Sequence, residues 1–198
     1  CNAVDEKGKY KNKNVNRLMT IRNSMVQAGL DAYNSKDYTS ATKYFGAFVE
    51  TRTDALFNEA DFSREQNFGQ IAYYAALAAY FNKDYKKCDQ YSDAALNSSE
   101  RDSIANDVII VKLGAYEEQA KAAAMDSATY VKNVRAMYDL FPENENIFGK
   151  LVGLYEEVGD KASAKSLLDT RLASNPNDAM ANAYVGQTAQ AEQKYDEA

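Results

Sequence analysis

A spacing of 34 residues recurs in the last third of the chain and limits what the chain can fold into. Three pairs of residues share this spacing: Pro142 and Pro176, Leu151 and Val185, and Ala164 and Ala198. A fixed period of this length is typical of repeat arrays, in which small supersecondary units stack on one another. The sequence therefore predicts several similar units in a row, rather than one domain built around a single centre.

Each period contains two predicted helices joined by a short turn. The apolar residues of the first helix recur at helical spacing: Ile147, Leu151, Leu154, Tyr155 and Val158. Gly159 is a predicted helix stop, and the carboxylate of Asp160 is a predicted N-cap for the second helix. That second helix ends at Asn175, before Pro176. One period is thus predicted to be an antiparallel helix hairpin.

These residues resemble the tetratricopeptide repeat (TPR), a helix hairpin of this length that ends in such a proline. The resemblance implies an all-α fold, a right-handed α-α superhelix (solenoid) of TPR-like hairpins. Hairpins are expected at about 15–53, 67–97, 101–141, 144–175 and 178–198, the last of them truncated, with an insertion at 54–66 and a polar linker at 1–14. Val152 and Arg171 stand where the family has small residues, and the family's tryptophan is absent.

Small residues mark the positions where the two helices of a hairpin are expected to approach closely. They are Gly29 and Ala41 in the first hairpin, and Ala76 and Cys88 in the second. The two pairs are 47 residues apart rather than 34, and this difference is what locates the insertion. Because Cys88 replaces an alanine, we expect it to be a buried packing residue and not a reactive thiol.

The composition argues against several classes of function. The chain has no histidine and only two cysteines, Cys1 and Cys88, so no catalytic residue, metal site or cofactor is predicted. The net charge is −6; residues 1–22 contribute +4, and the remainder therefore carries −10. Nucleic acid is not an expected partner of such an acidic body. No apolar run approaches the length of a transmembrane helix.

The two ends of the chain admit two interpretations. Cys1 is either the lipid-modified first residue of a mature bacterial lipoprotein or a boundary of an excised domain. Ala198 falls in the middle of an expected helix, which favours excision because such a helix cannot bury its apolar face. We therefore expect a truncation-induced self-contact at the C-terminal end. The linker and insertion look like those of exported TPR proteins of Gram-negative bacteria, which implies a periplasmic or cell-envelope location.

The resemblance also implies a function, because TPR arrays usually bind a protein or peptide in a groove lined by the first helix of each hairpin. By position, the expected groove residues are Tyr33, Asn34, Tyr73, Tyr74, Tyr80 and Phe81, with Lys112 in the third hairpin and Asn23 and Val26 in the first. Tyrosine offers a large contact area and a hydroxyl, which suits recognition. The competing interpretation is that these rings only fill space between hairpins.

Two rival functions remain open at this point. The Tyr- and Asn-rich part of the groove could hold a small ligand or a glycan, and a closed concavity would favour that alternative over a peptide. An enzyme is the weaker rival, because no convergent set of catalytic residues stands out in the sequence. The sequence favours a non-catalytic TPR scaffold that binds another protein.

Overall fold

The chain is all-helical in the computed structural model, which describes residues 11–58, 60–62 and 65–191. Within these residues there are nine α-helices and one short 3-10 helix: α1 (Lys11–Asn34), α2 (Tyr38–Glu50), η2 (Ala55–Phe57), α3 (Phe68–Phe81), α4 (Tyr85–Leu96), α5 (Arg101–Lys121), α6 (Ser127–Leu140), α7 (Glu145–Glu157), α8 (Lys161–Ser174) and α9 (Ala179–Ala191). Helix α1 begins at Lys11, inside the segment expected to be a linker. Cys1 and Ala198 lie outside the described residues, and so do the two expectations about the ends of the chain.

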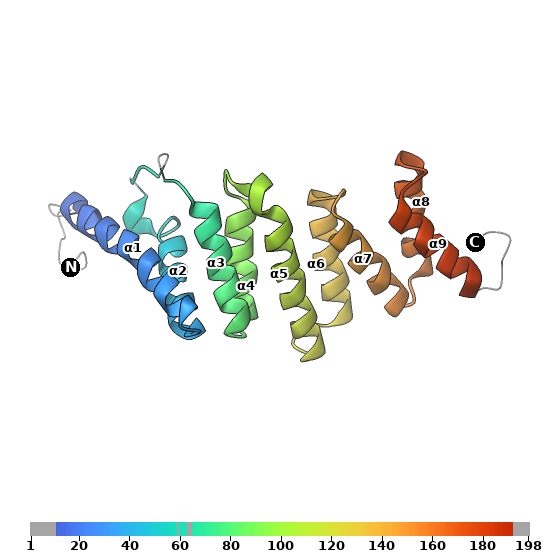
Figure 1. Ribbon diagram of the computed structural model, residues 1–198, viewed down its shortest axis with the longest axis horizontal. Coiled ribbons are helices and arrows are strands. Elements are labelled where there is room, and N and C mark those ends of the chain that lie inside the picture. Colours follow the sequence, from blue (N-terminus) through green and yellow to red (C-terminus); the bar gives the residue numbers. More distant parts are fainter. Residues whose placement is uncertain (1–10, 59, 63–64, 192–198) are drawn as a thin grey trace. The chain divides into compact units, whose positions relative to one another are not determined.

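Within each part of the chain, most helices that are neighbours in sequence pack against one another (Figure 1). The chain divides into two compact units, the first ending at Glu118 and the second beginning at Gln119. In the first unit α1 packs on α2, α2 on α3 and α3 on α4. In the second unit α6 packs on α7, α7 on α8 and α8 on α9. The boundary falls inside α5, and the repeat pattern of the sequence gives no sign of it.

The same turn follows helices α1, α3, α5 and α7. Each of these helices is followed by one residue with positive φ: Lys36, Lys83, Ala123 and Gly159. In three of the turns an aspartate follows this residue directly, and in the turn after α5 the aspartate comes three residues later. The carboxylate of each aspartate accepts a hydrogen bond from the backbone nitrogen of the third residue of the following helix. The four aspartates are Asp37, Asp84, Asp126 and Asp160. A left-handed residue ends a helix and an N-cap begins the next. The stop at Gly159 and the cap at Asp160 are therefore confirmed.

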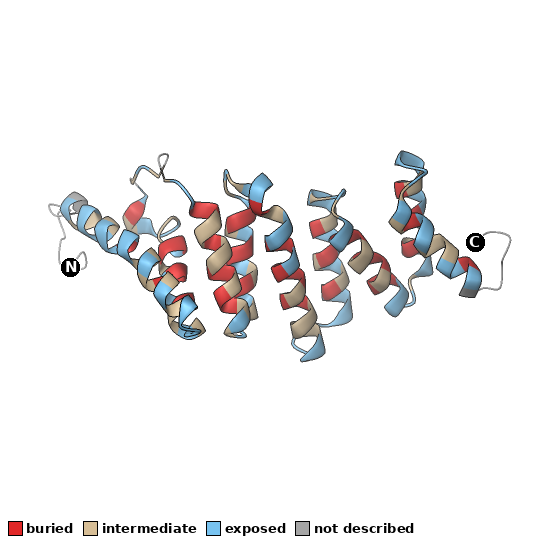
Figure 2. Cartoon of the chain, in the orientation of Figure 1, coloured by how far each residue is buried: buried red, intermediate tan, exposed pale blue. Residues whose placement is uncertain are grey.

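Small residues let the helices of the first unit approach closely. A Cβ atom on Gly29 would lie 2.6 Å from the Phe45 ring, so this glycine makes room for an aromatic ring of α2. Cys88 is fully buried, which confirms the expected burial of that residue. In Figure 2 the buried residues run along the sides of the helices that face their neighbours. These contacts remove apolar surface from water, which is the main source of stability in such a core.

Lys112 corrects one detail of the predicted groove. Its side chain is buried on α5 and forms ion pairs with two carboxylates of α4, at 3.0 Å from Asp89 and more closely with Asp93. The hydroxyl of Tyr116 donates to the same Asp89 at 2.7 Å. A lysine between two carboxylates is held in place by charge, because a buried ammonium needs compensation. Lys112 therefore ties α5 to α4, and its charge is used there.

The core of the second unit lies around α7. Four of its side chains, Ile147, Phe148, Leu151 and Val152, are fully buried. Val152 takes a position where TPR hairpins have a small residue, and it is accommodated inside this core. Arg171 on α8 is also buried and lies over the Phe148 ring, with Cζ 4.3 Å from the ring centroid. The arginine thus fills space as an apolar residue would, while its charge is paired elsewhere.

Candidate functional site

Eight aromatic rings form one connected cluster in the first unit, here called the aromatic belt. Its members are Tyr33, Tyr38, Phe45, Tyr73, Tyr74, Tyr80, Phe81 and Tyr85. They come from α1, the starts of α2 and α4, the middle of α2, and α3. Tyr33 is at the centre, with ring centroids 5.6 Å from Tyr38, 6.0 Å from Tyr74 and 6.4 Å from Phe81. The belt therefore links the first hairpin to the second.

Helix α3 positions half of the belt because its sequence separates small from bulky residues. Its small residues Ala72, Ala75, Ala76 and Ala79 are all fully buried. The bulky residues lie on the remaining face at helical spacing, so the packing of the alanine face forces the rings toward one surface. Two local features seat these rings. Phe45 is buried beneath Tyr74, and Gly114 leaves room for Tyr80, whose ring would be 3.2 Å from an added Cβ.

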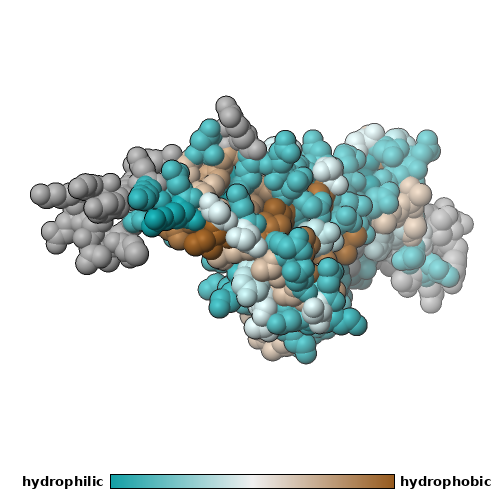
Figure 3. Space-filling view, turned by 60° about the vertical axis from the view of Figure 1, so that its left-hand side comes forward, coloured by the Kyte–Doolittle hydropathy of each residue, from teal (hydrophilic) through white to brown (hydrophobic). Residues whose placement is uncertain are grey.

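The predicted groove residues differ in how far they reach solvent. Tyr33, Tyr73, Tyr74 and Tyr80 are half-buried, whereas Asn34 is exposed and Phe81 is 46% exposed. The rings are therefore neither free side chains nor a closed core, and their outer edges are accessible. In the space-filling view, apolar side chains emerge in separate patches among hydrophilic ones (Figure 3). The structure brings the five predicted rings together, and their role in binding stays a prediction.

Two tyrosines of the belt, Tyr33 and Tyr73, have hydroxyls whose pKa is raised above the ordinary value. Burial raises the pKa of Tyr33, and the neighbouring phenols of Tyr38, Tyr73 and Tyr74 raise it further. Burial also raises the pKa of Tyr73, with smaller contributions from the carboxylate of Asp107 and from Tyr74. Both phenols are thus neutral at physiological pH and can donate a hydrogen bond as well as accept one. The belt offers uncharged aromatic faces with hydroxyl groups at their edges.

An open hollow lies on the first unit beside the insertion. It has a volume of about 420 Å³ and is lined by Met19, Asn23, Val26, Phe48, Asp61, Phe62, Glu65, Gln66 and Ile71. The predicted groove residues Asn23 and Val26 are among these, but the rings of the belt are not. The insertion supplies four of the lining residues, Asp61, Phe62, Glu65 and Gln66. The volume is within the range of ligand pockets, and the lining mixes apolar and polar groups.

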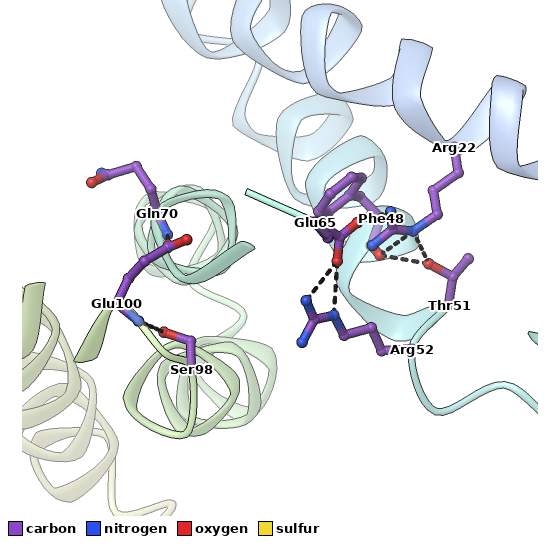
Figure 4. Close-up of polar contacts among 8 residues, drawn as sticks. All are labelled: Arg22, Phe48, Thr51, Arg52, Glu65, Gln70, Ser98 and Glu100. Carbon is purple, nitrogen blue, oxygen red and sulfur yellow. Dashed lines mark hydrogen bonds and ion pairs between the residues drawn. The ribbon is translucent and has the colours of Figure 1, made fainter. Parts of the chain in front are cut away.

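A buried arginine, Arg22, contacts two residues that line this hollow, Phe48 and Glu65 (Figure 4). The side chain of Arg22 is 1% exposed and ion-pairs with Glu65, which also pairs with Arg52 at 2.8 Å. The Nε atom of Arg22 donates to the carbonyl oxygen of Phe48 at 3.1 Å and to the Thr51 hydroxyl. Its guanidinium is stacked on the Phe48 ring, 3.6 Å from the centroid. These contacts fix the insertion to α1 and α2.

Sequence reasoning missed three members of the belt. Tyr38 and Tyr85 each follow a capping aspartate, so the sequence marks them as turn residues and not as part of a surface. Phe45 belongs to the second helix of its hairpin, which the resemblance does not assign to the groove. Tyr38 and Tyr85 occupy equivalent positions in the first two hairpins, and this recurrence is the sequence signal that could have pointed to them. The sequence position of Tyr38 does not predict that its ring contacts Phe81, and that of Tyr85 does not predict that its ring contacts Tyr80.

Metal-binding groups and membrane-spanning helices were both sought in the described part of the chain. Within residues 11–58, 60–62 and 65–191, His, Cys, Asp and Glu side chains do not gather in a group that could hold a metal ion. Over the same residues, no helix combines the length and the apolar character needed to cross a membrane.

Compared with protein-family models and with curated proteins, the sequence matches none. The likeness to TPR proteins therefore depends on the spacing, turn and helix residues of this chain alone.

Proposed function

We propose that this chain is a TPR-like array, a right-handed solenoid of helix hairpins, that binds a segment of another protein without catalysing a reaction. The observation that supports it best is the aromatic belt. Aromatic residues dominate the centres of protein interfaces because each ring supplies a large area at low entropy cost. Rings that belonged only to the core would be fully buried, like the alanines of the same helix; instead Phe81 is 46% exposed.

The recurring turn supports the repeat architecture. Four turns place a left-handed residue after one helix and an aspartate cap before the next, at Lys36, Lys83, Ala123 and Gly159. A repeated local structure of this kind is what stacked hairpins require, because each unit must reverse the chain in the same way. The location we propose, exported and periplasmic or in the cell envelope, follows from the resemblance alone.

A small ligand or a glycan is the second candidate. Tyrosine rings also stack on sugars, and the hollow of about 420 Å³ beside the insertion could hold a small molecule. The peptide is favoured because the belt extends over two hairpins, from Tyr38 to Tyr85, and is separate from the hollow. An extended surface of this kind suits a chain segment better than a compact ligand.

The two candidates can be separated with one pair of selections. The purified 198-residue chain is used to select from a displayed peptide library and, in parallel, to probe a glycan array. We expect enriched peptides whose binding is lost in Tyr73→Leu and Phe81→Ala. Tyr44→Leu is the matched control, since Tyr44 is 36% exposed on α2 and is not part of the belt. Belt-dependent glycan binding without peptides would favour the alternative, and failure of both selections would contradict the proposal.

A further inference from the structure

We propose that one side of α1 binds a second copy of this chain, with the two α1 helices antiparallel. This surface, here called the α1 seam, consists of five residues: Leu18, Ile21, Met25, Ala28 and Ala32. Helix α1 lies at one end of the first unit, and α2 packs against another of its sides (Figure 1). The aromatic belt contains none of the seam residues, so this inference does not depend on the proposed function.

The α1 seam is an apolar stripe that this chain leaves open to solvent. Ile21 is 52% exposed, and Leu18 is 37% exposed. The contacts of α1 with α2 and the insertion are made on the adjoining side of the helix, where Gly29 and Arg22 lie. The seam residues are alternately three and four positions apart, which is the spacing of the core positions of a coiled coil. A second helix with the same spacing is therefore a suitable partner.

The charges beside the seam favour a second copy of the same helix in the antiparallel orientation. Arg17 directly precedes Leu18, and Asp31 directly precedes Ala32, so both charges lie on one edge of the seam. Both side chains are exposed. When two copies of α1 lie antiparallel, the same edges face each other, and Arg17 of each copy meets Asp31 of the other. The contact then has two ion pairs of opposite charge, one toward each end.

The same alignment covers the most exposed part of the seam. When the two ion pairs form, Ile21 of each copy lies opposite Met25 of the other, at the centre of the contact. Leu18 lies opposite Ala28, so a large side chain meets a small one. The two copies use the same surface, and such a contact closes at two chains. A parallel pair would form neither ion pair.

Sedimentation equilibrium of the 198-residue chain tests the inference. We expect a reversible dimer with a dissociation constant of about 10–100 μM, because a seam of roughly four helical turns is a small interface. Ile21→Glu should weaken dimerisation at least about tenfold, since it buries a charge among apolar side chains. Ile110→Glu is the matched control, because Ile110 on α5 is also 52% exposed and lies outside the seam. This control should leave the dimer unchanged.

Charge reversal tests the antiparallel alignment. Arg17→Asp and Asp31→Arg should each weaken dimerisation by about fivefold, because like charges then face each other in both pairs. An equimolar mixture of these two single variants should associate as tightly as the parent chain. Each ion pair of the mixed dimer again joins opposite charges. Both residues are exposed, so the variants should fold as the parent chain does.

Three results would overturn the inference. The first is a parent chain that stays monomeric at about 500 μM, well above the expected dissociation constant. The second is a dimer that Ile21→Glu leaves intact, or mixed charge variants that fail to associate. The third is a chain that stays monomeric while selected peptides bind it through Ile21, which would assign the seam to a different partner.

Discussion

Each of the two units contains a buried arginine stacked on a phenylalanine, and the two arginines find their partners in different ways. Arg171 pairs with Asp178, seven residues further along the chain, at 2.7 Å. Asp178 also caps α9, where its carboxylate accepts from the backbone nitrogen of Ala181. Arg22 instead pairs with Glu65, which is 43 residues away in the insertion. The first contact is part of a regular turn, and the second exists only because the insertion folds back.

The glycines of the two units differ in how closely other residues pack against them. Gly46 is packed so closely that an added Cβ would overlap the hydroxyl of Tyr91, which itself donates to Glu50 at 2.6 Å. A Cβ on Gly153, in the second unit, would have no atom within 4 Å outside its own helix. The first unit thus depends on fitted contacts between distant residues. The second depends more on local turns and on the core around α7.

Removing the charge of Glu65 should have the largest effect. In Glu65→Gln the buried Arg22 loses its compensating carboxylate, so we expect the free energy of unfolding to fall by about 3–5 kcal/mol in urea denaturation. Hydrogen exchange should show lost protection in both α1 and α2. In Asp178→Asn the loss should be confined to α8 and α9. Asp102→Asn is the control, since that side chain is 97% exposed, and an equal loss there would contradict the prediction.

Adding a methyl group at Gly46 should have the next largest effect. Gly46→Ala forces the buried Tyr91 ring to move, and overpacking of this kind costs about 1–3 kcal/mol. Differential scanning calorimetry of the variant and the parent chain measures the change. An unchanged stability would contradict this prediction, because it would mean that α2 and α4 can make room for the added methyl group at no cost.

Cys88 should behave as a packing residue of the first unit. Cys88→Ala reproduces what the second unit has at Ala164 and should cost about 1 kcal/mol through a small cavity. Burial raises the pKa of the Cys88 thiol to about 12, so the thiolate is scarce at neutral pH. Labelling by a bulky thiol reagent should be slow under native conditions and fast in urea. Rapid native labelling would show that α4 opens easily.

The open glycine of the second unit should respond in the opposite direction. Gly153→Ala fills free space in the middle of α7, and alanine favours a helix over glycine by about 0.5–1 kcal/mol. The free energy of unfolding should therefore rise by this amount. A loss of stability would show that residue 153 contacts something other than solvent.

Acid should affect the second unit slightly more than the first. Hydrogen bonds hold the pKa of Asp126, Asp160 and Asp178 in the second unit, and of Asp37 in the first, below the ordinary value for aspartate. The unfolded chain then binds more protons than the folded chain in this range. The stabilisation is complete above the ordinary pKa and is lost as pH falls through the lowered pKa.

Asparagine is the matched substitution for this effect, because it caps a helix but does not titrate. The double variant Asp126→Asn and Asp160→Asn should keep helicity at pH 7 and lose less protection in α6 and α8 between about pH 5 and pH 2. Hydrogen exchange measured across this pH range reports the difference. An unchanged pH dependence would show that other carboxylates dominate the acid response.

The sequence alone determined the parts of the fold that depend on neighbouring residues. Gly159 and Asp160 identify a helix stop and a cap because both act within one turn of chain. The division of α3 into small and bulky faces follows from helical spacing, and it predicted the side of the helix on which its four rings of the belt lie. Cys88 was identified by its match to close-approach alanines. Each of these signals involves residues a few positions apart, where backbone geometry leaves little choice.

Only the tertiary structure decided which distant side chains meet. Lys112 was expected on the groove, but it is buried and paired with two carboxylates of α4. Arg22 and Glu65 gave no sign of pairing, and the rings of Tyr38 and Phe81 meet only once two hairpins are stacked. The physical reason is that a helical period specifies the direction of a side chain on its own helix. What lies in that direction depends on how the next helix packs.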